Sequence, residues 1–575
     1  MGQSESSVTQ HTLSAGEELS KQLAEQFAAK CFSHIEMVSF KDNFRALADT
    51  QDGVRYWKEE TLTQFLELPD VAGIRSIIFQ MTSNLGAFPF ESKGPAILNL
   101  EALVKAVALV TGRSAKVLKQ DDHLRILFRS LAVREKKPTI DSNGNNALDG
   151  VAEQGSEDED EEDLVLDELK ALDGADDLAK ERSSYSLHIP IDHLRHLLQF
   201  LLAIPSLQQT ESLSLYADKF SDPSIATTAE CLLRCFPTVE SGIKYRSFKT
   251  TIRKLMPHLF SQGLPQLFLH FLYSENFTAV RSPTALSPSS LSPIPIEEPQ
   301  PIILKPSELM TPALLSQLSL FISSDRLFRR VRPLYLGSSD GFSMGAFETK
   351  VVNWRAPTIL LVSGQRISEP PSNRERSLTE RLPLRRHPAG SDPEGDGKVV
   401  FGAFIQSPWK ISHKECFGDS QTILFQLSPV MRIWKAGGGS REFVYFNRDD
   451  GVGFGAPVQD WKNTRRQSPY FHTGAVSLVL DNGLEWGVMT ATGDEGAFRM
   501  DGGEKIQERF EVLELEVWGC GGEKEAEEQL KVWQWEEREA LLRRQINLGK
   551  DIEADRALLE MAGLVGQNQS GGSMN

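Results

Sequence analysis

The spacing of apolar residues changes once along this chain, and that change limits the folds it can adopt. Up to about residue 275, apolar side chains recur every three or four positions, which is the period of amphipathic helices. After residue 310 they occur in short runs separated by glycines, which is typical of buried strands. The pattern therefore predicts an α+β protein, with an all-helical region followed by a strand-rich domain.

Three polar segments divide the chain further. Residues 282–306 are rich in Ser and Pro, which is typical of an interdomain linker. Residues 139–179 and 366–397 are dominated by polar and charged side chains, and we predict that both are unstructured insertions. The predicted organisation is a flexible N-terminus (1–18), a helical region (19–275), a linker (276–310), a strand-rich domain (311–522) and a C-terminal helix with a polar tail (523–575).

The charge of the chain is concentrated in the first insertion. The 575 residues contain 62 Lys and Arg against 79 Asp and Glu, a net charge of −17. Between Glu153 and Ala179, thirteen acids stand against the single Lys170, so this segment accounts for −12 of the net charge and the remainder for −5. No stripe of Lys and Arg is evident in the sequence, and direct binding to nucleic acid is therefore not expected.

The first six residues carry a lipidation motif. Met1-Gly2-Gln3-Ser4-Glu5-Ser6 fits the pattern for N-myristoylation of Gly2. One myristoyl chain gives only marginal membrane attachment, and the first thirty residues contain no polybasic run or cysteine that would add a second signal. We therefore expect peripheral membrane contact that depends on a protein partner. The five scattered cysteines favour a reducing, cytoplasmic compartment.

Residues 49–60 resemble a degenerate EF-hand loop between two helices. A calcium loop needs oxygen ligands at its first, third and fifth positions, Gly at the sixth and Glu at the twelfth. With Gly53 sixth, Ala48 and Thr50 fall at ligand positions; with Asp49 first, Val54 replaces the glycine. Neither register works, so we interpret the segment as a helix–loop–helix without calcium, and we expect no metal and no other cofactor in the chain.

The second half contains seven apolar runs that predict strands. Several of them do not alternate strictly between apolar and polar residues, as expected for strands covered on both faces. Packed together with a few flanking helices, they predict a β-sandwich. The runs are residues 358–362, 399–405, 422–427, 441–446, 476–480, 485–488 and 510–517.

An ordered series of motifs runs through this half. The first motif, residues 334–347, contains Ser339, Asp340 and Gly341, and the last, residues 510–519, contains Trp518 and Gly519. Between them lie the motif residues Gly402, Trp409, Gly451, Gly453 and Gly455. In this order the motifs resemble the TLDc domain family. The Met-Gly-Gln-Ser start, the helical half and the TLDc-like domain together resemble the fungal restriction of telomere capping protein 5 family.

The motif residues indicate structural roles. The glycines suit tight turns or close backbone approach, Asp340 suits a turn whose backbone amides it caps, and the two tryptophans suit a core. His413, Glu415 and Cys416 suggest a catalytic thiol, but neighbours in sequence do not all converge on one point. We therefore expect no catalytic residues.

The resemblance implies a function that the residues alone do not. TLDc proteins are associated with oxidative-stress resistance and with binding the vacuolar proton ATPase, so it implies a monomeric, non-catalytic regulator of that pump, cytoplasmic and partly peripheral at the vacuolar membrane. The family name implies an alternative, a factor that influences telomere capping without direct DNA binding. An unrecognised antioxidant or hydrolytic enzyme is the third hypothesis.

Overall fold

The structure is a computed structural model of the chain. It describes the helical and strand-rich halves and the short segments that connect their elements. The described residues are 15–51, 53–71, 73–90, 94–118, 123–136, 185–208, 211–237, 242–273, 307–323, 327–328, 331–367, 382–383, 386–390, 395–437, 439–458, 472–500, 502–521, 527–529, 531, 534–535 and 538. The lipidation motif at Gly2, the predicted acidic insertion, residues 282–306 of the predicted linker and most of the predicted C-terminal helix lie outside this range.

The helical half is built from short amphipathic helices around α5, a helix that is buried on nearly every side. Ser33 and Glu36 form a capping box at the start of α2, in which each side chain accepts a hydrogen bond from the other residue's backbone N–H. The helices are α1 (Ala15–Cys31), α2 (His34–Leu47), α3 (Glu59–Phe65), α4 (Ile74–Ala87), α5 (Leu100–Val110), α6 (His123–Leu131), α9 (Ile191–Ala203), α10 (Ala217–Phe220), α11 (Pro223–Leu233), α12 (Tyr245–Leu255) and α13 (Gly263–Leu269), with 3-10 turns η2 (Arg113–Lys116), η3 (Leu213–Tyr216) and η4 (His270–Leu272).

Two small hairpins accompany these helices. β1 (Asp49–Gln51) and β2 (Val54–Tyr56) pair where the sequence resembles an EF-hand loop, and Gly53 makes the turn with φ of 80°. β3 (Val133–Lys136) and β4 (Tyr185–His188) pair at the two ends of the predicted acidic insertion. The helical region is therefore α-helical with two added antiparallel pairs, which its helical periodicity does not predict.

One antiparallel sheet of ten strands forms the second half, accompanied by α15 (Pro312–Ser319), α17 (Gly337–Asp340) and α18 (Met344–Val351). The strand order is β10-β11-β12-β13-β14-β6-β7-β8-β9, with β5 beside the end of the long strand β14. The strands are β5 (Val331–Leu336), β6 (Thr358–Arg366), β7 (Lys398–Ile405), β8 (Ile423–Ser428), β9 (Arg432–Lys435), β10 (Val444–Asn447), β11 (Gly451–Phe454), β12 (Val476–Leu480), β13 (Trp486–Ala491) and β14 (Ile506–Cys520).

The sheet is covered on both faces, as the continuous apolar runs predict. On β6, Leu360 and Val362 point into the core of the sheet domain, which also receives side chains from β7 through β14. The alternate residues Ile359 and Leu361 belong to the core of the helical half. Side chains from β6 to β9 and from β10 to β14 meet in one apolar cluster, so the single sheet folds over its own core as the two layers of a sandwich do. With the helical region before it, this confirms the predicted α+β fold.

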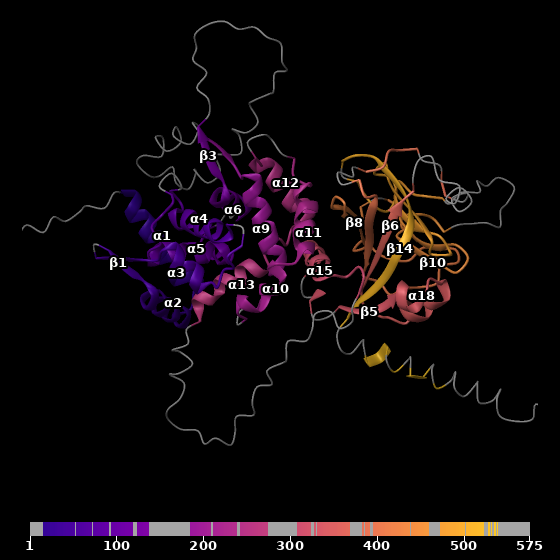
Figure 1. Cartoon of the computed structure of the whole chain (residues 1–575), viewed down its shortest axis with the longest axis horizontal. Helices are drawn as coiled ribbons and strands as arrows, with labels where there is room; N and C mark the ends of the chain where they lie inside the picture. Colours follow the sequence, from indigo (N-terminus) through magenta and orange to yellow (C-terminus); the bar gives the residue numbers. More distant parts are fainter. Residues whose placement is uncertain are drawn as a thin grey trace, which may run out of the picture.

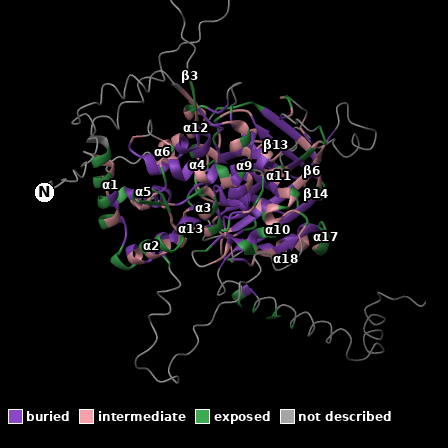
Figure 2. Cartoon of the chain, turned by 60° about the vertical axis from the view of Figure 1, so that its left-hand side comes forward, coloured by how far each residue is buried: buried purple, intermediate pink, exposed green. Residues whose placement is uncertain are grey.

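The helical half packs against the face of the sheet that carries Ile359 and Leu361. In Figure 1, α11 and α15 lie between the helical half and the sheet, and the ring of Phe321 packs edge-on against Phe425 of β8 at 5.2 Å. Gln317 of α15 donates to the carbonyl of Leu427 at 3.0 Å, and Arg234 donates to that of Pro429 at 3.3 Å. Figure 2 shows exposed residues on α1 at the outer side and buried ones around α9 and the sheet. The halves therefore pack as one body.

Candidate functional site

The first family motif forms a tight turn between β5 and α18. The carboxylate of Asp340 accepts a hydrogen bond from the backbone N–H of Leu336 at 3.0 Å and pairs with Lys350 at 3.4 Å. Gly341 has φ of 84°, and its carbonyl accepts a hydrogen bond from the Tyr335 hydroxyl at 2.8 Å. Ser339 is exposed on α17. The motif therefore fixes the backbone of the turn, and Ser339 is one of its solvent-exposed residues.

The remaining motif glycines lie where the backbone meets a neighbouring element. A Cβ at Gly453 would lie 2.0 Å from the ring of Tyr445, the residue directly opposite on β10. Side chains at Gly402, Gly451, Gly455 and Gly519 would meet their neighbours at 2.1–2.6 Å. These glycines hold strands, turns and aromatic rings close together, which is a packing role.

Substituting Gly453 with Ala is expected to destabilise the protein by about 2–3 kcal/mol, because the added methyl group overlaps the Tyr445 ring and the buried pair must separate. Gly345→Ala is the matched control, since a Cβ there meets nothing within 4 Å and the residue lies in α18. Urea denaturation of both variants checks this: an unchanged unfolding midpoint for Gly453→Ala would contradict the packing role.

The two motif tryptophans are buried and their indole nitrogens are satisfied. Trp409 is 2% exposed and donates to the Thr358 hydroxyl at 2.8 Å, and it contacts Phe347 of α18. Trp518 on β14 is fully buried and donates to the carboxylate of Glu516 at 2.9 Å. Both rings therefore serve as core residues.

Glu516 is a buried carboxylate that the sequence interpretation did not single out. It is 1% exposed, and besides Trp518 it accepts hydrogen bonds from the segment that precedes α15. These come from the Ser307 hydroxyl at 2.7 and 2.8 Å and from the backbone N–H groups of Glu308, Leu309 and Met310 at 3.0–3.3 Å. Glu516 therefore fixes the chain to the sheet where it enters the second half.

Glu508, also 1% exposed, anchors a second segment to the same strand. Both of its oxygens accept from Arg366 at 3.0 Å, and it also accepts the backbone N–H of Gly390 at 2.6 Å. The neighbouring Gln507 accepts from the N–H of Arg386 at 2.7 Å. Residues 386–390, which lie in the segment predicted to be an unstructured insertion, thus have defined contacts with β14.

A third acid, Glu514, completes the row of buried carboxylates on β14. It accepts the backbone N–H groups of Ser338 and Leu515 at 3.1 Å, and burial raises its pKa. The row connects α17, the start of α15 and the segment after β6 to one central strand. These carboxylates anchor other segments of the chain to β14, since each accepts hydrogen bonds from backbone amides or from an arginine of the chain itself.

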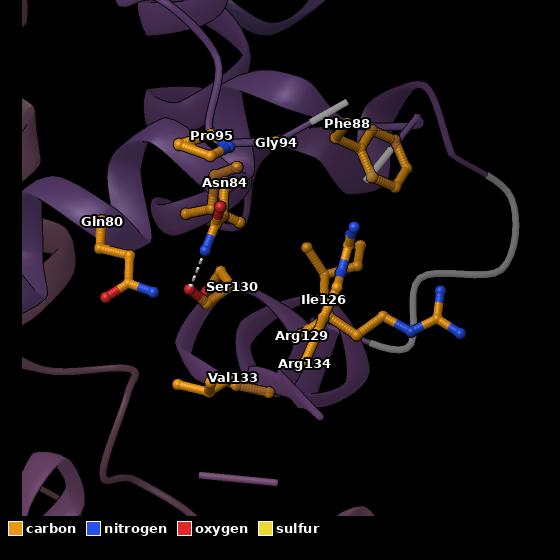
Figure 3. A pocket seen from close by; sticks show the side chains of 12 residues that line it. Gln80, Asn84, Phe88, Gly94, Pro95, Ile126, Arg129, Ser130, Val133 and Arg134 are labelled. Carbon is orange, nitrogen blue, oxygen red and sulfur yellow. Dashed lines mark hydrogen bonds between the residues drawn. The ribbon is translucent and has the colours of Figure 1, made fainter. Parts of the chain in front are cut away.

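The described surface contains two notable hollows, both in the helical half. The first, of about 160 Å³, lies between α4, α6 and β3, and Figure 3 shows Arg129 and Arg134 at its rim. Asn84 within it donates to the carbonyl of Ser130 at 2.9 Å. The second, of about 530 Å³, lies between α5, α6, α12 and α13. The first is smaller than the ~300–1,000 Å³ usual for small-molecule sites, and neither adjoins a family motif.

The geometry around Cys416 does not favour a catalytic thiol. Burial raises the pKa of this thiol to about 11, and its sulfur points to the carbonyl of Ala456 at 3.7 Å. His413 and Glu415 are exposed to solvent instead. A reactive cysteine needs a lowered pKa, so the enzyme hypothesis gains no support from this cluster. Cys235, half-buried beside the sheet, has its pKa raised to about 12 in the same way.

A family match covers the same part of the chain as these motif residues. Residues 303–521 match the TLDc domain family, the span that contains the sheet, its motif residues and the Glu516 anchor. The chain is thus a TLDc-domain protein.

Matches to fungal proteins extend over the whole chain. It is 42% identical to "Restriction of telomere capping protein 5" of Leptosphaeria maculans over the full length of both proteins. It is 40% identical to the protein of the same name from Colletotrichum graminicola, over 97% of each, and 31% identical to that of Aspergillus flavus, over 98% of each. The chain belongs to the restriction of telomere capping protein 5 family.

Within the described part of the chain, every helix is too short or too polar to cross a lipid bilayer.

Proposed function

We propose that this protein is a non-catalytic regulator that binds the vacuolar proton ATPase through its TLDc domain. The observation that carries the proposal is the TLDc match over residues 303–521, since pump binding is associated with that family. The geometry agrees with a binding role. The motif glycines and tryptophans pack within the sheet domain, and the loops that connect its strands and helices carry exposed side chains that can contact a partner.

Phe342 is the exposed side chain that we nominate for that contact. It lies within the first motif, directly after Gly341, and is 40% exposed, with its ring against Gly337. Aromatic residues, Phe included, are enriched at protein–protein interfaces relative to the rest of the protein surface. We therefore place the pump contact at the turn between α17 and α18.

In the same proposal the protein acts as a monomer in the cytoplasm and at the vacuolar membrane, which it reaches through myristoyl-Gly2 and through the pump. Oxidative-stress resistance would be a consequence of regulated acidification.

Affinity purification from native membranes tests this function. We expect pump subunits to be recovered with the full chain and to fall severalfold with Phe342→Ala, which removes an exposed ring but no buried contact of the sheet core. Val54→Ala, 51% exposed on the β1–β2 hairpin, is the matched control and should retain them. Failure to recover the subunits with either the unaltered chain or Gly2→Ala would refute the proposal.

A second candidate function comes from the name of the relatives, restriction of telomere capping. In that case the same purification would yield telomere-end proteins in place of pump subunits. The first candidate is preferred because the TLDc domain provides a binding module, whereas no residue described above provides a contact to DNA.

A further inference from the structure

Single β-bridges join the loops of the helical half in pairs. Trp57 bridges Leu98, and Ile189 bridges Ile243, both in antiparallel orientation. In each of these four loops the bridging residue stands two positions before the first residue of the next helix, which is α3, α5, α9 or α12. The same local arrangement therefore occurs four times in the described part of this half.

Each bridging loop lies between two helices, so the half contains four helix–loop–helix units. α2 and α3 flank the first loop, α4 and α5 the second, α6 and α9 the third, and α11 and α12 the fourth. The bridges join the first unit to the second and the third to the fourth. Helix–loop–helix units are the building blocks of EF-hand proteins, so the resemblance seen in residues 49–60 extends over the whole half. Among the described residues, no three His, Cys, Asp or Glu side chains are grouped to hold a metal ion.

The two pairs of units differ in how their outer helices meet. The inner helices pack on each other in both pairs, α3 on α4 and α9 on α11. In the second pair the outer helices α6 and α12 also pack directly, with the rings of Phe128 and Phe248 5.5 Å apart. In the first pair the outer helices are α2 and α5, and residues 263–272 (α13 with η4) contact both, with η4 on α2 and α13 on α5 (Figure 1). The first pair is therefore open, and residues 263–272 lie in the groove between its outer helices.

The segment in this groove has the pattern of a bound amphipathic helix. Its apolar residues are spaced i, i+3, i+4 and i+7, which is the pattern of helices that lie in a hydrophobic groove of a partner. Each of the four is at most 1% exposed; they are Leu264, Leu267, Phe268 and Phe271.

Phe271 is the main anchor of the segment. Its ring lies 5.3 Å from the ring of Phe40 on α2 and 4.7 Å from that of Phe65 on α3. It also lies 5.3 Å from the ring of Trp57, the bridging residue of the first loop. The anchor thus contacts both helices and the loop of the first unit.

The backbone of the segment is held as well. The side chain of Asn43 on α2 donates to the carbonyls of Phe271 at 3.2 Å and of Tyr273 at 2.8 Å. At the other end, Gly263 lies against the end of α9, where a Cβ would be 2.0 Å from the carbonyl of Ile204. Residues far earlier in the chain therefore bind the segment at both ends.

We propose that the helical half is a calcium-independent EF-hand-type module, and that the groove of its first pair is a peptide-binding site whose ligand is residues 263–272 of the same chain. In EF-hand sensors a calcium ion opens the pair and exposes a hydrophobic groove for a partner helix. Here the bound segment itself keeps α2 and α5 apart. The predicted linker follows this segment, so its binding also fixes where the chain leaves the helical half.

A synthetic peptide of residues 261–273 tests this proposal without the pump, so its failure is distinct from failure of the proposed function. Fluorescence anisotropy measures binding of the labelled peptide to the full chain. We expect the Phe271→Ala chain to bind it at least tenfold more tightly than the unaltered chain, whose groove is occupied. A peptide that carries the same Phe271→Ala change should not bind. Affinity should be equal in calcium and in chelator.

Phe248→Ala is the matched control, because it removes an equally buried ring from the second pair, and it should gain no affinity for the peptide. Asn43→Ala removes two hydrogen bonds without a cavity in the aromatic core and should gain affinity severalfold. Its result decides the matter if thermal melting shows that Phe271→Ala does not fold. Folded variants that bind the peptide no better than the unaltered chain would overturn the proposal. So would an equal gain in Phe248→Ala, or a tenfold change in affinity on removal of calcium.

Discussion

Replacing Glu516 with Ala is expected to lower the free energy of unfolding by about 3–5 kcal/mol, one of the two largest effects of a single substitution that we predict. The carboxylate is 1% exposed and accepts hydrogen bonds from Trp518, Ser307 and three backbone N–H groups. Removing it leaves these donors buried without an acceptor and releases the start of α15 from the sheet. Urea denaturation measures the loss.

Two further variants separate this anchoring from a general effect of charge. Glu516→Gln keeps one oxygen acceptor but turns an NH₂ group toward donors, so its loss should be smaller than that of Ala but still clear. Glu485→Ala removes an exposed acid before β13 and should change stability little. If Glu516→Ala unfolds at the same urea concentration as Glu485→Ala, the anchoring role is wrong.

The buried acids of β14 show where sequence interpretation reaches its limit. Leu515 and Val517 alternate with Glu514 and Glu516, a pattern that predicts acids in solvent on the outer face. The outer face of this strand is instead covered by chain segments about 180 to 210 residues away in sequence, which supply amide donors. Periodicity gives the face of each residue but not what covers that face.

The sequence pattern does not predict three short or irregular strands, and the reason is different. β11 is Gly-Val-Gly-Phe, β5 contains Pro333 and β9 has only four residues, so each lacks the β-branched run that identifies a strand. All three are paired by neighbours on the sheet. By contrast, β12 spans the predicted residues 476–480, and β6, β7 and β14 each enclose the predicted run, because long apolar segments bounded by turn residues specify strands locally.

Replacing Arg366 with Ala is expected to cost about 3–5 kcal/mol, because it leaves Glu508 buried without its bidentate partner. Arg432 lies nearby but is already engaged with Gln426 at 3.2 Å and Glu504 at 3.3 Å, so it is a poor substitute. The loss should be visible as an earlier urea midpoint and as faster proteolysis after β6, where residues 386–390 are held by the same strand.

The double variant Arg366→Met/Glu508→Gln distinguishes an uncompensated charge from a simple loss of packing. Because it removes both charges while Gln keeps an acceptor for the N–H of Gly390, it should recover at least half of the stability lost by Arg366→Ala. Arg448→Ala breaks an ion pair with Glu348 whose arginine is 62% exposed, and it should leave the urea midpoint nearly unchanged. A double variant less stable than Arg366→Ala would mean that the pair acts by filling space, and that the charge on Glu508 is well solvated in the folded protein.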